Sequence, residues 1–282
     1  MKIHDTVTYF VSNYEPTEEY LDHYYNQFKN HYTEYFAYHC HNVAQKRKDA
    51  IKKHTNKIAE LIEIKDRMHG AILEIKSQYE NIYGVRFTKD VHLLVGLYGS
   101  NAYTYRQFSP EIAFCLEKVP ASNTHLQILI AHEFGHATNN LFSIKQGIEW
   151  ENVEWMNPLT WLIQEGIATY LSTQIIDGRL DEYFAFEEDP EWILFARNHS
   201  TIIQLQFVHD LNHYSSQEIF KEWFSINGGG HFGVTRLGYY IGYMVVKKLI
   251  QELGEEQVLS LWARDDFFEI VKSQLISGYI EV

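Results

Sequence analysis

The chain has 282 residues, of which 45% are hydrophobic and 22% charged, as expected for a folded protein with a substantial core. Its formal net charge of −13 argues against a nucleic-acid partner, and the lack of any run of 18 apolar residues argues against a membrane span. Two cysteines, Cys40 and Cys115, make no secreted disulfide framework, and no signal-peptide pattern is visible at the start. We therefore expect a cytoplasmic protein; the oligomeric state is left open.

The first part of the chain has a helical pattern from residue 17 to about residue 83. A second helical stretch within it begins near Val43, with a possible break at Gly70. Aromatic side chains recur at close to the 3.6-residue helical period at Tyr20, Tyr24, Phe28, Tyr32, Tyr35 and Phe36. This pattern predicts a helical N-terminal region over residues 1–84.

Strand-like alternation begins after Gly84, over residues 85–97, and a turn is expected at residues 99–101. A second short strand is predicted over 111–117, where the alternation with polar residues is typical of a sheet edge. Helices are then predicted to begin at Thr124 and at Pro158, and a final helix pair follows Thr235. The expected fold class is α+β and mostly helical, with a second domain over 85–282 or one continuous domain.

The motif that carries chemistry is the run His132-Glu133-Phe134-Gly135-His136, an HExxH motif. Residues four apart share one face of a helix, so His132 and His136 can direct their imidazoles at one ion. Glu133 is rotated by about 100° and can instead reach a water bound to that ion. Zn²⁺ lowers the pKa of such a water to near 7, so a carboxylate is a sufficient base. The motif predicts a zinc site with Glu133 as the general base.

A catalytic zinc site usually has three protein ligands and one open position. The third His of a metzincin would fall at Phe142, which excludes that class. Glu165, 29 residues after His136, is a lone carboxylate in an otherwise apolar helix, where it would be costly to bury without a compensating charge. Glu165 is therefore the predicted third metal ligand, and Gly166 is expected to allow its helix to pack closely against the helix of the two histidines.

The HExxH motif followed by Glu165-Gly166-x-Ala168 resembles the thermolysin-like gluzincin metallopeptidases, and most closely the small bacterial zinc-dependent proteases with this helix pair. The resemblance covers roughly residues 85–250. It implies a zincin-like mixed sheet whose edge strand, here 111–117 around Ala113, binds an extended peptide above the zinc helix. A later Gly-Tyr-x-x-Gly helix also recurs in that family, and residues 238–242 resemble it.

The oxyanion formed during hydrolysis needs a hydrogen-bond donor opposite the metal. Tyr239 matches the Gly-Tyr position of the family and is the predicted catalytic donor, while Arg236 and His231 are candidate substrate-binding residues near the glycine-rich loop. The sequence departs from the family at Thr169, where a thermolysin-like site has Asp. The exopeptidase motif of the large gluzincin aminopeptidases is absent from the sequence.

Other histidine pairs give weaker signals. His209 and His213 have the same four-residue spacing, but Asp210 stands where the general base would be, and no Glu-Gly-x-Ala helix follows. His39 and His41 flank Cys40 in a weak chelating cluster. The leading hypothesis is thus a zinc peptidase acting on peptide or protein substrates. The alternatives are an inactive peptide-binding or regulatory protein on this scaffold and a zinc hydrolase of non-peptide amides or esters.

Overall fold

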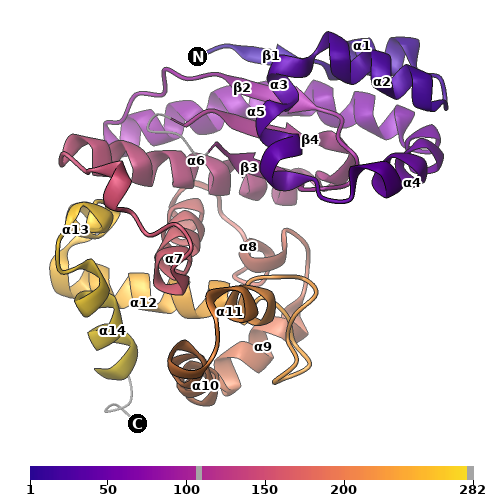
Figure 1. The fold of residues 1–282 in the computed structure, drawn as a ribbon. Helices are drawn as coiled ribbons and strands as arrows, with labels where there is room; N and C mark the ends of the chain where they lie inside the picture. The colour runs from indigo at the N-terminus through magenta and orange to yellow at the C-terminus, as the bar shows by residue number, and fades with distance from the viewer. Residues whose placement is uncertain (106–109, 278–282) are drawn as a thin grey trace. The chain divides into compact units, whose positions relative to one another are not determined.

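Figure 1 draws the chain as a computed structural model, which describes residues 1–105 and 110–277. The chain forms two compact units, Met1–Ala137 and Thr138–Val282. Their boundary falls inside helix α6 (Asn123–Lys145), so this helix contributes to both units. The boundary predicted at residues 84–85 lies within the first unit.

The first unit contains a four-stranded mixed sheet with the order β1-β2-β4-β3. The strands β1, β2 and β4 are parallel, and β3 runs antiparallel to β4. Residues Val91–Leu94 and Ile112–Cys115 are all buried, because β2 and β4 occupy the centre of the sheet. The strand bounds are β1 (Ile3–Asp5), β2 (Val91–Leu94), β3 (Ala102–Thr104) and β4 (Ile112–Cys115).

The prediction of an edge strand over 111–117 is wrong, because β4 lies between β2 and β3. The polar residues that suggested an edge have partners inside the unit. Glu117 is 2% exposed and accepts hydrogen bonds from the backbone N–H groups of Gly96 and Tyr98, at 2.8 and 3.1 Å. Glu111 receives a 2.6 Å hydrogen bond from His92 Nε2. Glu117 thus fixes the loop that follows β2, and Glu111 bonds to a side chain of β2 itself.

The helices of the first unit pack around this sheet, and four residues of the aromatic repeat, Tyr20, Tyr24, Tyr32 and Tyr35, are buried. Tyr24 and Tyr32 are buried and share a 2.6 Å hydrogen bond between their hydroxyls. Tyr32 Oη also accepts from Val95 N and donates to Val95 O, both at 3.0 Å. These bonds connect the helix over Lys29–Glu34 to the residue that follows β2. The bounds are α1 (Val7–Asn13), α2 (Glu18–Gln27), α3 (Lys29–Glu34), the π-helix Tyr35–His39, α4 (Val43–Thr55), α5 (Ile58–Tyr83) and the 3₁₀ turn Leu116–Lys118.

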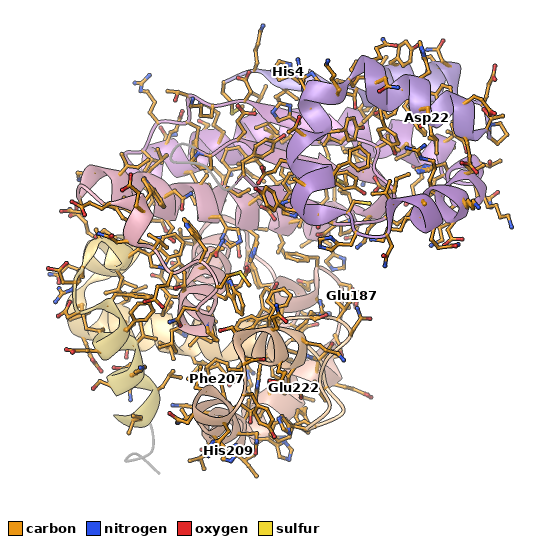
Figure 2. All side chains as sticks on the ribbon, viewed as in Figure 1. His4, Asp22, Glu187, Phe207, His209 and Glu222 are labelled. Atoms are coloured by element: carbon orange, nitrogen blue, oxygen red, sulfur yellow. The ribbon has the colours of Figure 1, made fainter. Side chains whose placement is uncertain are left out.

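Two features of this region differ from the sequence expectation. Helix α5 continues through Gly70 without a break, and the interruption falls instead at residues 56–57, between α4 and α5. The N-terminal region is not purely helical, because β1 joins the sheet beside β2. His4, labelled in Figure 2, anchors β1 through a 2.8 Å contact between its Nε2 atom and Asp90 Oδ2.

The second unit is built from helices, and its principal contact is between α7 and α12. These two helices cross where Gly166 meets Gly242, so that backbone approaches backbone. No helix in the described part of the chain is long and apolar enough to cross a membrane. The bounds are 3₁₀ turn Trp150–Asn152, α7 (Pro158–Ile175), α8 (Glu182–Ala185), α9 (Pro190–Asn198), α10 (Ser200–His213), α11 (Ser216–Trp223), α12 (Leu237–Leu253), α13 (Glu255–Leu259), 3₁₀ turn Leu261–Ala263 and α14 (Phe267–Ser277).

His54 makes the stability of the first unit depend on pH. Its side chain is fully buried between the rings of Phe10, Tyr14 and Tyr98, and burial lowers its pKa from 6.5 to about 4. The folded state therefore holds His54 neutral, while the unfolded state takes up a proton as the pH falls through 6.5. Stability from this group is fully present above pH 6.5 and is lost toward pH 4, at a cost of about 3 kcal/mol.

We therefore expect His54→Phe to lose much of the acid destabilisation between pH 7 and pH 4, measured as the free energy of unfolding in urea. The exposed His69, replaced by Gln, is the control and should retain the wild-type pH dependence. Equal pH dependence in His54→Phe and the wild type would contradict this account.

Candidate metal centre

Helix α6 holds the HExxH motif in a buried stretch of the first unit. The residues that precede it, from Leu126 to Ala131, are all at most 1% exposed, except Gln127. The backbone carbonyl of Ala131 accepts a 2.7 Å hydrogen bond from Tyr79 Oη on α5. Phe134 packs edge-on against Phe87, with ring centroids 4.8 Å apart. These contacts fix the rotation of α6 about its axis.

His132 and His136 lie one helical turn apart, as their spacing predicted. Their ring centroids are 4.7 Å apart and the rings are perpendicular, at 89°. The side chains are 3% and 7% exposed. Burial lowers the pKa of His132 to about 3, so its imidazole is neutral at pH 7, which is the form that binds a metal ion.

Glu133 is 6% exposed and has a hydroxyl partner that the sequence did not indicate. Thr104 Oγ1 lies 2.9 Å from Glu133 Oε2 and 3.1 Å from Glu133 O. A single hydroxyl proton cannot satisfy both acceptors fully, and the charged carboxylate is the stronger one. Thr104 is thus a positioning residue for Glu133.

Thr104 ends β3, the terminal strand of the sheet on the side opposite β1. Tyr105 N donates to Glu111 O and Cys115 N donates to Asn101 O, so odd-numbered residues of this strand face β4. The backbone groups of Thr104 therefore point away from β4. The edge strand next to the motif is β3, and the assignment of Ala113 as a peptide-pairing residue is wrong, because Ala113 is buried with a strand on either side.

Glu165 lies in the second unit, near the middle of α7. This helix begins with Pro158 and is capped by Asn157, whose side-chain oxygen accepts a 3.0 Å hydrogen bond from Leu159 N. Gly166 is expected from the sequence to allow close packing on the helix of the two histidines. Within the second unit, the helix that it packs against closely is α12. A Cβ atom at Gly166 would overlap the carbonyl of Gly242 and lie 2.9 Å from Val246 Cγ2.

The three further predicted site residues all lie near or on α12 in the second unit. Tyr239 is partly buried, with its ring 6.1 Å from that of Phe224. Arg236 precedes the helix with a left-handed φ of 63°, and its Nη1 donates to the carbonyl of Phe184 at 3.2 Å. His231 is exposed and bonds through Nε2 to Asp210 Oδ2 at 2.8 Å. Their roles toward a substrate stay predictions.

The second histidine pair sits on the surface of α10. The rings of His209 and His213 stack with centroids 4.1 Å apart, and the His209 side chain is 53% exposed. Figure 2 labels His209 on α10. Asp210 points inward instead and accepts from Trp223 Nε1 at 2.9 Å. Asp210 is buried beside the pair, contacts His209 Nδ1 at 3.3 Å and is bonded to His231 Nε2 at 2.8 Å, so neighbouring side chains already engage its carboxylate.

Cys40 is buried, which raises the pKa of its thiol, and the ring of His39 stacks on Tyr103 with centroids 3.9 Å apart.

Comparison with known proteins finds no matching family model, no matching curated protein and no matching solved structure.

The α7–α12 contact gives a prediction about the helix that carries Glu165. Gly166→Ala should force the two backbones apart and lower the free energy of unfolding by at least about 2 kcal/mol. The matched control is Gly70→Ala on α5, where a Cβ meets nothing within 4 Å. That variant should be neutral or more stable by up to about 1 kcal/mol. Chemical denaturation of both variants measures the difference, and equal stabilities would rule out tight packing at Gly166.

Proposed function

We propose that this chain is a zinc-dependent peptidase whose Zn²⁺ is held by His132, His136 and Glu165. The observation that carries the proposal is the buried HExxH motif of α6, with two imidazoles on one face and a carboxylate between them. Two imidazole nitrogens and one carboxylate oxygen are a donor set typical of catalytic zinc. These three residues also form a group that could hold a metal ion by its donor chemistry.

When bound, Zn²⁺ would polarise the scissile carbonyl and lower the pKa of a water molecule, so that a base can convert it to a nucleophile at neutral pH. The protein's own part begins with Glu133, which takes the proton from the attacking water and then passes it to the leaving nitrogen. Thr104 holds the Glu133 carboxylate in place through its 2.9 Å hydrogen bond. A water-excluded setting strengthens these interactions, which agrees with the burial of Glu133 and both histidines.

The open side of β3 is the proposed peptide-binding edge. The backbone N–H and C=O of Thr104 point away from β4 and could pair with an extended substrate. The Ala102 N–H lies on the same side and donates to Asn101 Oδ1 at 2.9 Å, so an incoming peptide would have to replace that bond. A substrate paired with the backbone of Thr104 would pass close to Glu133, because the Thr104 side chain contacts the Glu133 carboxylate.

The proposed metal ligands are tested by metal analysis of purified protein. Wild type should contain one zinc ion per chain, and His132→Ala and Glu165→Ala should each lower metal content to near zero. The control His209→Ala removes a histidine of the same spacing from the surface of α10 and should leave the zinc content unchanged. Zinc retained in Glu165→Ala would remove Glu165 from the ligand set.

The proposed base is tested separately with two variants that keep the ligands. Glu133→Gln should bind zinc but lose hydrolysis of a peptide library by at least about a thousandfold, because glutamine cannot act as the general base. The cleavage products of the library report turnover directly. Thr104→Val is nearly isosteric and should bind zinc with hydrolysis slowed by roughly tenfold, the effect of about 1.4 kcal/mol.

Full activity in Glu133→Gln would end the peptidase proposal. Zinc binding by wild type without cleavage of any peptide would favour an inactive peptide-binding or regulatory protein. Cleavage confined to non-peptide amides or esters would favour a zinc hydrolase of those compounds.

A further inference from the structure

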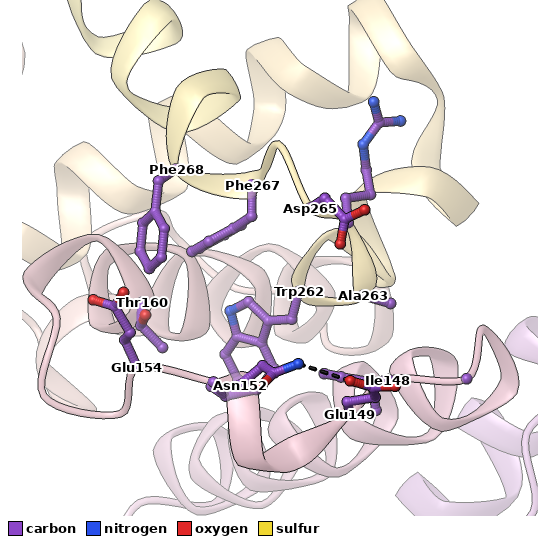
Figure 3. A pocket seen from close by; sticks show the side chains of 13 residues that line it. Ile148, Glu149, Asn152, Glu154, Thr160, Trp262, Ala263, Asp265, Phe267 and Phe268 are labelled. Carbon is purple, nitrogen blue, oxygen red and sulfur yellow. Dashed lines mark hydrogen bonds between the residues drawn. The ribbon is translucent and has the colours of Figure 1, made fainter.

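The second unit contains a pocket of about 400 Å³ that involves none of the proposed zinc ligands. It lies between the loop that follows α6, the first turns of α7 and the segment that leads into α14. Figure 3 shows the rings of Phe267 and Phe268 pointing toward Trp262 and Thr160. Aromatic side chains therefore make up much of one wall.

Ring contacts connect this aromatic wall to two further tryptophans of the same unit. Trp262 meets Trp155 edge to face, with centroids 5.7 Å apart at 77°, and Trp155 stacks on Trp150 at 5.9 Å. Phe267 and Phe268 are tilted at 62° with centroids 4.8 Å apart. The negative faces of aromatic rings attract organic cations, and most strongly so for tryptophan.

Carboxylates add negative charge to the same pocket. Glu149 and Glu154 each accept a hydrogen bond from an uncharged asparagine amide, at 2.8 and 2.9 Å, and neither has an ion-pair partner in that contact. Asp265 is exposed on the rim. The lining guanidinium, Arg264, already pairs with Asp266 at 2.8 Å, outside the lining. The charge that faces a ligand is therefore negative.

Two buried polar groups in the lining also need partners. Trp262 is 8% exposed and Thr160 is 1% exposed, yet neither Trp262 Nε1 nor Thr160 Oγ1 has a hydrogen-bond partner among the described residues. Figure 3 shows the indole nitrogen on the side of the Trp262 ring that faces Phe267. Leaving such a donor unpaired destabilises the folded protein, and a ligand with a carbonyl oxygen would satisfy it.

We propose that this pocket binds a basic amino-acid residue. Its ammonium or guanidinium group lies beside Glu149 and Asp265, its alkyl stem packs on Phe267 and Phe268, and its carbonyl oxygen accepts from Trp262 Nε1. The same chemistry is offered by a free basic amino acid and by a lysine or arginine within a peptide. The proposal does not depend on the zinc site.

The test follows the Trp262 indole N–H signal by NMR in ¹⁵N-labelled full-length protein, assigned by its loss in Trp262→Phe. The probes are Nα-acetyl-lysine N-methylamide, its neutral analogue Nα-acetyl-norleucine N-methylamide, and free lysine. The lysine amide should shift this signal in a saturable way, and the norleucine amide should bind at least about tenfold more weakly. A response to free lysine equal to that of the amide assigns the site to free amino acids, whereas a weaker response assigns it to peptides.

Matched carboxamide variants identify the charge that is recognised. The double variant Glu149→Gln with Asp265→Asn should weaken binding of the lysine amide about tenfold or more, since it removes two negative charges without changing shape. The control Glu151→Gln removes one charge from the adjacent, exposed 3₁₀ turn, outside the lining, and should bind as wild type does. Equal binding of the lysine and norleucine amides, or no saturable shift of the Trp262 signal with either, would overturn the proposal.

Discussion

Burial of two imidazoles on one face of α6 is the constraint on which the candidate site depends. An imidazole in an apolar setting is held neutral, as the low pKa of His132 shows, and a neutral nitrogen is a ligand rather than a cation. The helix supplies the spacing, while Tyr79 and Phe87 of the first unit set its rotation. The two histidines lie on one face of a buried helix turn, so the proposed metal site would need a third donor and an open position beside them.

The sheet contributes the other half of the site through one short strand. Because β3 closes the sheet antiparallel to β4, its last residue reaches α6 and Thr104 contacts the carboxylate of Glu133. The same strand direction turns the backbone of Thr104 outward. One residue thus links the proposed general base to the proposed substrate edge, so that chemistry and binding share a rigid element.

The second unit uses close backbone packing where the first uses buried aromatic rings and hydrogen bonds. Glycines at 166 and 242 let α7 and α12 approach at the backbone, and this fixes the helix that carries Glu165. Elsewhere in the unit, a cluster of tryptophans packs beside an acidic, aromatic pocket, two of whose polar groups have no hydrogen-bond partner among the described residues. The two features are built from separate residues and can be tested independently.

The sequence by itself determined the helical spacing of His132 and His136, the start of α7 at Pro158 and the helical character of the chain from residue 17 to about residue 83. These follow from local rules, since positions one turn apart meet whatever the rest of the chain does. Only the tertiary structure decided that β4 is central, that β1 joins the sheet, that Thr104 contacts Glu133 and that Gly166 meets α12. Strand order and helix partners arise from contacts between distant segments, and a three-residue strand such as β3 carries too short a pattern to reveal them.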